Sequence, residues 1–492
     1  MLSDDCGTQR LTRARFLALA AAGAAALAVP GALADEARAD EEPVWRFVTR
    51  PDLAPPMVEV STALPTAAPG YVFLAPASGA SQLGPLIVDE TGEPVWFHPL
   101  PLTSGESAHD FRVQTYNGRP VLTWWEGVYA NGYGQGECVI VDDSYQEVTR
   151  VGAGNGYAAD LHEFTLTPRG TALVTAYNSV PADLSAAGGP VDGQLLEGVV
   201  QEVDVASGVV LFEWHSAEHV TLAESYLPVT AGIWDYFHVN SIDLLDDGDY
   251  LVSARHTSTI YKLDAHTGEI VWRLGGKLSD FAMGPGTAFA YQHDARGHGS
   301  DVISVFDDGG YSPQSAIEPS SRAIVLQLDL DAMTAELAVA HANPHGALSF
   351  AMGNVQLLAD GGMFVGWGTT PGCSEFAADG TLRFDATLPD GGFSYRTYRS
   401  PWTGTQTAPP SLAVVPAGDG SVQAYMSWNG ATGVSHWQLL GGSERSRLKP
   451  LHTVARTGFE TSVRVQHAPA YLAAAALDGK SRTLASTKVV RV

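Results

Sequence analysis

Histidine recurs at one position of a repeating unit, directly ahead of a hydrophobic strand and a Gly-containing turn. Imidazole can act as a nucleophile, a base or a proton donor near neutral pH. If each unit is one blade of a closed β-propeller, equivalent positions on the innermost strands converge around the central axis. The recurrence therefore predicts a ring of imidazoles in one funnel, contributed by His109, His162, His238 and His293.

One hairpin, FHVNSIDLLDDGDYLVSARH, adds further polar side chains to this ring. His238 precedes its first strand and Arg255 ends its second, so both emerge at the same edge. Arg offers a planar fork of permanent positive charge that suits an oxyanion. The hairpin, which also contains Asn240 and His256, is therefore a candidate anion-binding element.

Repeated hairpins must position these residues. Period-2 apolar residues flank Gly-containing turns in stretches such as HEFTLTPRGTALVTAYN, and a second element such as DAHTGEIVW follows as an outer hairpin. The acidic pairs Asp246-Asp247 and Asp307-Asp308 precede Gly and are interpreted as turn residues. The insertions 180–197 and 274–290 are expected to be loops that cap one face. We count six units, with seven as the alternative, near 70–104, 107–151, 159–215, 236–276, 290–341 and 344–396.

The fold class is therefore predicted as all-β: a six-bladed β-propeller followed by a small C-terminal fibronectin III or immunoglobulin-like β-sandwich. Short strands past a TGTQTAPP linker, with Trp428 and Trp437 on successive strands, indicate the sandwich. The expected segments are an export signal at 1–34, an extended segment at 35–68, the propeller at 69–402, the linker at 403–410 and the sandwich at 411–492.

The N-terminus predicts export. Basic residues, an Ala/Leu run and a small-residue cleavage site at Ala32-Leu33-Ala34 are typical of a signal peptide, by the Tat or the Sec route. An uncleaved anchor helix is the alternative. The mature protein is expected to be secreted or at the cell surface, where the sandwich is a candidate attachment module. No later stretch is long and apolar enough to span a membrane.

Charge and cysteine content narrow the possible partners. The net charge of −26 makes nucleic acid an unsuitable partner. After removal of the signal, Cys138 and Cys373 are the only cysteines. Outside the cell they are free either to pair or to stay as two separate buried thiols, and the sequence leaves both alternatives open.

Several motifs resemble those of the bacterial arylsulfate sulfotransferases and their wider arylsulfotransferase-like family. These are WDYFHVNS, SARH and FAYQHDARGH, and the resemblance covers about 45–402. The later GNVQ, GWG, SEF and SYRTYR stretches resemble the actinobacterial and fungal branch. In contrast to the characterised enzymes, whose additional sandwich is N-terminal, the sandwich expected here is C-terminal.

The resemblance implies a ping-pong aryl sulfotransferase that uses no nucleotide donor, cofactor or metal. Its partners would be aryl sulfate and phenolic small molecules. His293 would be the transiently sulfated nucleophile, and His162, His238 and Arg255 would complete the catalytic set. The expected substrate-binding residues are Asn240, His256, His298 and His109, with His345 as a further secondary candidate.

Two other functions remain open. One is a metal-dependent propeller hydrolase or lactonase, which would need converging Glu, Asn and Asp side chains, whereas the repeated residue here is His. The other is a non-catalytic surface or carbohydrate-binding propeller. Propeller histidines often bond neighbouring backbone, so convergence of His162, His238, Arg255 and His293 on one place would favour the enzyme.

Overall fold

The computed structural model describes residues 43–101, 105–229, 232–389 and 391–492, so the predicted export signal lies outside the described residues. The described chain confirms the predicted all-β class. Its only helical elements are single turns, namely η2 (Ser185–Ala187), α2 (Ser216–His219) and η3 (Leu222–Glu224). Within the described ranges, no helix has the length and apolar character that a bilayer crossing requires.

Six sheets of mainly antiparallel strands make up the larger part of the chain, and three of them are built mostly from its first half. The first contains β27 (Ser394–Ser400), β2 (Tyr71–Pro76), β3 (Leu86–Val88) and β4 (Pro94–Phe97), in that order. The second contains β5 (Ser107–Tyr116), β6 (Arg119–Ala130), β7 (Tyr133–Val141) and β8 (Glu147–Val151). The third contains β9 (Phe164–Leu166), β10 (Thr171–Ala182), β11 (Gly193–Asp204) and β12 (Val210–His215), with β13 (Ile233–Asp235) beside β11.

The other three sheets continue the same meander. The fourth contains β14 (Val239–Leu244), β15 (Tyr250–Ala254), β16 (Thr259–Leu263) and β17 (Ile270–Gly275). The fifth contains β19 (His293–His298), β20 (Val302–Asp307), β21 (Arg322–Asp329), β22 (Thr334–Ala342) and the short β18 (Ala282–Met283). The sixth contains β23 (Asn354–Leu357), β24 (Met363–Gly366), β25 (Cys373–Phe376), β26 (Leu382–Thr387) and β1 (Glu59–Ala63).

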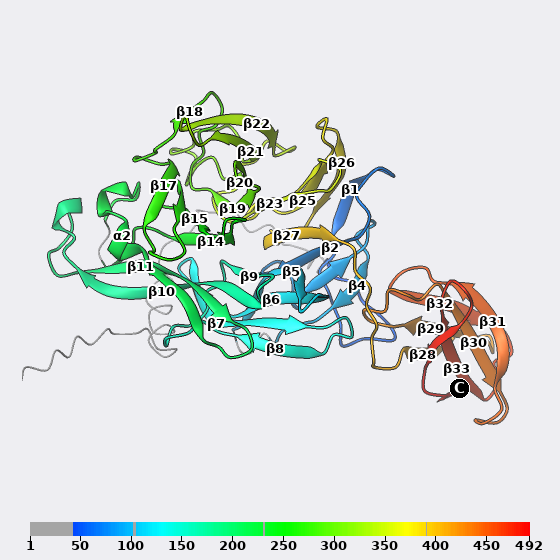
Figure 1. The fold of residues 1–492 in the computed structure, drawn as a ribbon. Coiled ribbons are helices and arrows are strands. Elements are labelled where there is room, and N and C mark those ends of the chain that lie inside the picture. The colour runs from blue at the N-terminus through cyan, green and yellow to red at the C-terminus, as the bar shows by residue number, and fades with distance from the viewer. Residues whose placement is uncertain (1–42, 102–104, 230–231, 390) are drawn as a thin grey trace, which may run out of the picture.

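The first strands of the sheets meet at a common centre (Figure 1). Contacts run from β5 to β9, from β14 to β19, from β19 to β23, from β23 to β27 and from β27 back to β5, while β10 contacts β14. Apolar clusters fill the space between neighbouring sheets. One of them joins Phe73 and Ile87 of the first sheet to Phe111 and Trp124 of the second. Trp214 of the third sheet donates from Nε1 to the carbonyl of Gly268 in the fourth at 3.1 Å. The sheets therefore form a closed ring.

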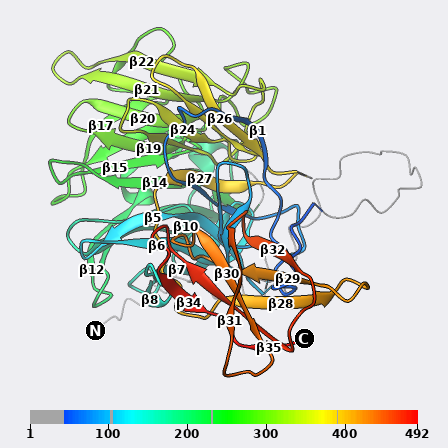
Figure 2. The same ribbon diagram turned by 90° about the vertical axis from the view of Figure 1, so that its right-hand side faces the viewer.

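The chain from residue 411 folds into two further sheets. One contains β28 (Ser411–Pro416), β29 (Val422–Ser427) and β32 (Glu460–Val465). The other contains β31 (Lys449–Ala455), β30 (His436–Gly442), β33 (Tyr471–Leu477), β34 (Thr483–Ser486) and β35 (Val490–Arg491). Figures 1 and 2 show both beside the first sheet of the ring. The Phe459 ring lies 4.1 Å from that of Phe47, and Asn429 exchanges two hydrogen bonds with the Phe97 backbone.

Three features of the structure differ from the sequence predictions or decide between alternatives that they left open. The 394–400 segment, counted partly with the sixth unit, pairs as β27 with β2, and β1 from the supposed extended segment pairs with β26. The 180–197 insertion is only partly a loop, because β10 and β11 stay in register from Thr171↔Asp204 to Ala182↔Gly193. Cys138 and Cys373 are two free buried thiols, and burial raises the pKa of both.

Candidate active site

Irregularities of the backbone occur at or beside three of the predicted histidines. The register of the inner strand shifts between His109 and Arg112 in the second sheet and between His293 and Arg296 in the fifth. The fourth sheet shifts just after His238, whose φ is 55°. A bulge leaves one residue out of the ladder and turns neighbouring side chains to a new direction. A register shift therefore occurs beside the recurring histidine in each of these three sheets.

The imidazoles surround one buried tyrosine of the last ring strand. The ring centroid of Tyr395 lies 5.5 Å from that of His162, 6.2 Å from that of His109 and 6.4 Å from that of His293. The Tyr395 hydroxyl donates to the His162 carbonyl at 3.1 Å. His238 packs edge-on against His162 at 4.9 Å. The structure thus brings the four recurring histidines together.

A carboxylate fixes the tautomer of three of these rings. The Nδ1–H group of His162 donates to Asp160, that of His238 donates to Asp235 at 2.5 Å, and that of His293 donates to Asp308 at 2.7 Å. A carboxylate partner at Nδ1 keeps the proton there and leaves the lone pair on Nε2. Each ring therefore keeps a lone pair on Nε2.

Nε2 of His293 has one weak partner in the described structure. The Met352 N–H donates to it at 3.2 Å, which requires a lone pair on Nε2. Burial and the nearby Arg255 guanidinium hold the pKa of His293 well below its usual range, so the ring stays neutral. A neutral ring with this tautomer has the electron pair that nucleophilic attack at Nε2 needs.

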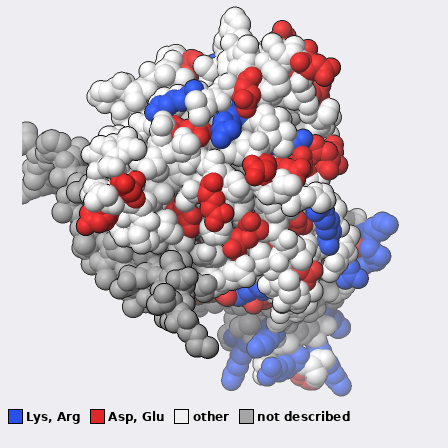
Figure 3. Space-filling model, turned by 60° about the vertical axis from the view of Figure 1, so that its left-hand side comes forward, with Lys and Arg blue, Asp and Glu red and all other residues white. Residues whose placement is uncertain are grey.

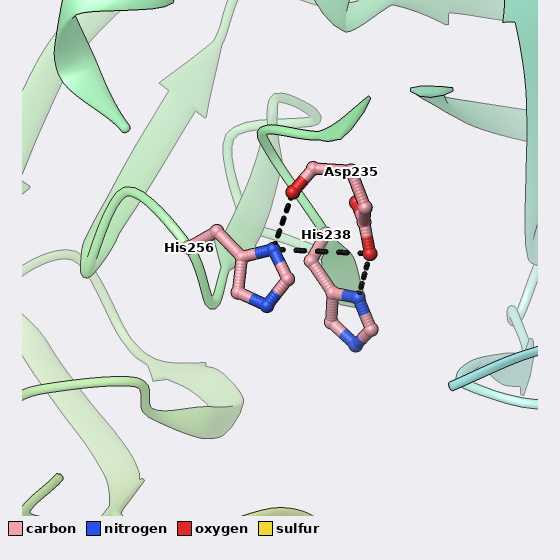
Figure 4. A group of neighbouring side chains, drawn as sticks. All are labelled: Asp235, His238 and His256. Carbon is pink, nitrogen blue, oxygen red and sulfur yellow. Dashed lines mark hydrogen bonds and ion pairs between the residues drawn. The ribbon is translucent and has the colours of Figure 1, made fainter. Parts of the chain in front are cut away.

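Arg255 is held by His256, whose own contact with the Asp235 carbonyl is drawn in Figure 4. His256 donates from Nδ1 to the Asp235 carbonyl at 2.7 Å, and its Nε2 accepts from Arg255 at 2.8 Å. A second Arg255 amino group donates to the Phe350 carbonyl at 2.5 Å. The buried Nε–H of Arg255 has no partner among the described residues. His256 is thus a positioning residue, and Arg255 keeps a free donor for an anion.

A family model described as Arylsulfotransferase (ASST) matches residues 112–388, more than half of the chain and the part that contains His162, His238, Arg255 and His293. The chain belongs to the arylsulfotransferase (ASST) family. The match begins after His109 and ends before Tyr395, so the family model includes only part of the group around the tyrosine.

Solved structures similar to this ASST-family chain are remote. A Bacteroides caccae protein of unknown function is 16% identical, with 67% of this chain and 98% of that one covered and a TM-score of 0.42. The Pseudomonas aeruginosa periplasmic gluconolactonase is 14% identical, with 80% and 99% covered and a TM-score of 0.36. A catalytically inactive virginiamycin B lyase from Staphylococcus aureus is 10% identical, with 75% and 96% covered and a TM-score of 0.33. Comparison with curated proteins gives no match.

The remaining predicted residues of the ASST-family chain have different positions. Asn240 is buried beside the histidines and donates from Nδ2 to the Gln292 carbonyl at 2.6 Å, which ties β14 to the segment before His293. His298 ends the strand that His293 begins, about 16 Å along an extended chain. Its Nε2 bonds Ser304 at 2.8 Å, so we leave it out of the site. His345 is 54% exposed and bonds Asp385.

Sequence reasoning missed the acidic partners of the ASST-family site. The turn interpretation is wrong for Asp308, which is fully buried and bonded to His293, and for Asp307, which pairs with Arg322 at 2.7 Å. Asp160 and Asp235 lie two and three residues before His162 and His238. A search for carboxylates just ahead of each histidine could have found this second pair.

A buried ionic network lies beneath the histidines. Asp110, Glu163 and Asp294 each directly follow a recurring histidine, and Arg396 contacts all three within 3.5 Å. Burial raises the pKa of Glu163, but the guanidiniums of Arg296, Arg396 and Arg112 outweigh it and lower that pKa well below its usual range. The His-Asp and His-Glu pairs in the sequence were the available signal for this network.

Three side chains of the site lie close enough to bind a metal ion: Asp235, His238 and His256 (Figure 4). Two imidazoles and a carboxylate are a known set for transition metals. Here the same atoms bond one another, and Arg255 donates to His256. A bound ion would have to displace these hydrogen bonds. Burial raises the pKa of Asp235, but His238 and His256 lower it to about 2, which keeps the carboxylate charged.

Burial of His109 links the stability of the ASST-family fold to pH. Desolvation in its fully buried position lowers its pKa from 6.5 to about 3. Between these values the unfolded chain binds a proton that the folded chain does not. The stability contributed by the neutral ring is therefore complete above pH 6.5 and is lost toward pH 3, at about 1.4 kcal/mol per pH unit. We expect denaturant midpoints to fall over this range.

The His109→Phe variant should make that fall less steep, because Phe takes up no proton. The matched control is His266→Phe on an exposed turn, which should keep the wild-type pH profile. Urea midpoints of the three proteins at several pH values provide the measurement. An unchanged profile in His109→Phe would contradict the assignment of this proton uptake to His109.

Proposed function

We propose that this protein transfers a sulfuryl group from an aryl sulfate to a phenolic acceptor through a sulfohistidine at His293, without a nucleotide donor. The observation that carries the proposal is the convergence of His162 and His293 on Tyr395, with His238 packed against His162 and a carboxylate at each Nδ1. Membership of the ASST family supports the same reaction class.

In the first step the Nε2 lone pair of His293 attacks sulfur. The N–S bond forms as the S–O bond to the aryl group breaks, and the phenolate leaves with the bonding electron pair. Sulfuryl transfer, like phosphoryl transfer, has a loose transition state with charge on the equatorial oxygens. The free Nε–H of Arg255 is a donor for that charge. The sulfated ring keeps its Nδ1 proton. Burial raises the pKa of Asp308 even though Arg255 opposes the shift, and the positive charge that develops on the sulfated ring favours the ionised carboxylate beside it.

In the second step the acceptor phenol attacks sulfur as the N–S bond breaks, and the electron pair returns to Nε2 of His293. His238 takes the phenol proton at its own Nε2. Burial lowers the pKa of His238 even though Asp235 opposes the shift, so the ring is a neutral base at pH 7. His238 then releases this proton to solvent, and the phenolate that departs in the first step takes one proton from solvent, which balances protons over the two steps.

The proposal extends to the architecture and location of the chain. We take the six ring sheets as the blades of a propeller and residues 411–492 as a fibronectin III-like sandwich. Export would follow from the leader at 1–34. In residues 411–492 Lys and Arg outnumber Asp and Glu, although the chain as a whole is acidic. Figure 3 likewise shows acidic side chains over the upper part of one face and basic ones toward its lower edge. This supports the sandwich as a surface-attachment module.

Intact mass and peptide mapping after brief mixing with p-nitrophenyl sulfate test the proposal. We expect one sulfuryl adduct on His293 and release of p-nitrophenol that depends on added phenol. An adduct on His162 or His238 would move the nucleophile to that ring. Absence of adduct and release with several aryl sulfates would contradict the transferase and leave the binding-protein alternative.

The cluster of Asp235, His238 and His256 supports one second candidate function, a metal-dependent hydrolase. The two functions differ in their need for metal and acceptor. A hydrolase would lose activity on treatment with EDTA and regain it with Zn²⁺ or Mn²⁺, and added phenol would not change its rate. The proposed transferase keeps its activity in EDTA.

A further inference from the structure

A pocket lies next to Arg255, with Tyr291 as a shared neighbour. Its volume is about 350 Å³, at the lower end of the range for small-molecule sites. Its walls are mostly apolar and aromatic and come from the end of β17, from β18 and from the segments before His293 and around residue 316. The lining includes the side chains of Tyr226, Met283, Ala288, Phe289, Tyr291 and Ile317.

The pocket is joined to the candidate active site by direct contacts. The Arg255 guanidinium carbon lies 5.3 Å from the centroid of the Tyr291 ring, which forms one wall. The Tyr226 N–H donates to the His256 carbonyl at 2.8 Å. The Tyr291 N–H donates to the Ser258 hydroxyl at 3.1 Å, and Tyr291 itself is two residues before His293. A group bound here would therefore lie beside the residues that would hold a sulfuryl group.

The side chains that line the pocket are suited to an aromatic ring of a ligand. Tyr226, Phe289 and Tyr291 offer ring faces or edges, while Met283 and Ile317 add apolar surface. A sugar would need several donors and acceptors. The Ser258 hydroxyl already accepts from Tyr291, and the Ser315 hydroxyl accepts from the backbone of its own turn. The polar groups available to a ligand are therefore few.

A positive charge at the rim complements this ring site. Lys277 lies 4.8 Å from the centroid of the Tyr226 ring and donates to the Ser225 carbonyl at 2.6 Å. Tyr226 is 46% exposed and Ile317 is 52% exposed, so the pocket opens to solvent beside this ammonium group. In a protein with a net charge of −26, this local cation would favour the approach of an anionic aryl sulfate.

The geometry points to this pocket as the aryl-binding subsite, which holds the aromatic ring of the sulfate ester or of the phenolic acceptor while the reacting oxygen faces Arg255. The assignment deepens the proposed sulfuryl transfer and rests on it for its role. Binding of the ring itself requires no turnover, so the two proposals can fail separately.

The test is equilibrium binding of 4-methylumbelliferone, a fluorescent phenol, to the full chain in the absence of any sulfate donor. Ala288 is exposed and lines the pocket, so Ala288→Trp should fill it without disturbing the core. Ala282 is also exposed, lies in the same 274–290 segment and does not line the pocket, which makes Ala282→Trp the matched control. We expect at least a tenfold weaker affinity in Ala288→Trp and wild-type affinity in Ala282→Trp.

Steady-state kinetics with p-nitrophenyl sulfate separate the two proposals. If the wild type binds the probe and Ala288→Trp does not, but no variant turns over, the pocket stands and the proposed function fails. If the wild type turns over and Ala288→Trp keeps both the wild-type KM and the wild-type probe affinity, the subsite assignment is overturned. Tighter binding of a simple sugar than of the phenol would also overturn it. Melting temperatures verify that both Trp variants are folded.

Discussion

Replacing His293 by Ala is expected to abolish both sulfuryl adduct formation and phenol-dependent release of p-nitrophenol. The ring supplies the Nε2 electron pair for the first displacement, and the Ala side chain has no atom that can form the N–S bond. Loss of a covalent nucleophile removes a whole reaction path, so we expect at least about a 10⁴-fold fall in kcat. Stopped-flow release of p-nitrophenol, together with intact mass, measures both effects.

The chain provides a matched control on the same strand. His298 ends β19 and bonds Ser304 away from the histidine cluster, so His298→Ala should keep the adduct and the rate within a few-fold of wild type. His293→Ala should also keep the affinity for 4-methylumbelliferone, because the proposed aryl pocket is intact. A variant that loses His293 and still forms the adduct would contradict its role as the nucleophile.

Replacing Arg396 by Leu is expected to cause the largest loss of stability. Its guanidinium is fully buried and contacts Asp110, Glu163 and Asp294. Removing one member of such a network leaves buried carboxylates without their counter-charge, which costs about 3–5 kcal/mol. We expect a lower urea midpoint, read from the near-UV signal of the buried aromatic residues. Loss of transfer should follow, because Arg396 also donates to the Asn240 carbonyl at 3.0 Å.

Two further variants test whether charge causes that loss. Arg50→Leu removes a more exposed arginine, which pairs with Asp52, and should leave the midpoint unchanged. Adding Glu163→Gln to Arg396→Leu should restore part of the loss, since the amide carries no charge. If Arg396→Leu and Arg50→Leu have the same midpoint, the network contributes nothing to stability.

Much of the fold followed from local patterns in the sequence. Alternating apolar residues and Gly turns predicted the antiparallel hairpins, and recurrence of histidine at one position predicted that the four imidazoles lie close together. Arg255 and His238 meet because they flank a single hairpin. These predictions depend on residues that are close in sequence or repeat regularly.

The parts that were missed depend on contacts between distant segments. Asp308 has the sequence context of a turn residue, and only the packing of the fifth sheet makes it the partner of His293. Tyr395 and Arg396 reach the centre because β27 pairs with β2, more than 300 residues earlier. His298 stands five positions after His293 on an extended strand, so its closeness in sequence does not bring it to the same place as His293.

The pairing of β27 with β2 also determines when the site can exist. The first sheet contains strands from both ends of the ring, and β1 similarly crosses to the sixth sheet. Tyr395 and Arg396 can therefore reach the histidines only after the chain has been made beyond residue 396. A shorter chain contains His109, His162, His238 and His293 but lacks the tyrosine and arginine around which they gather. Within the ring the site can form only once its last strand, β27, is available, and contacts of such high sequence separation form slowly.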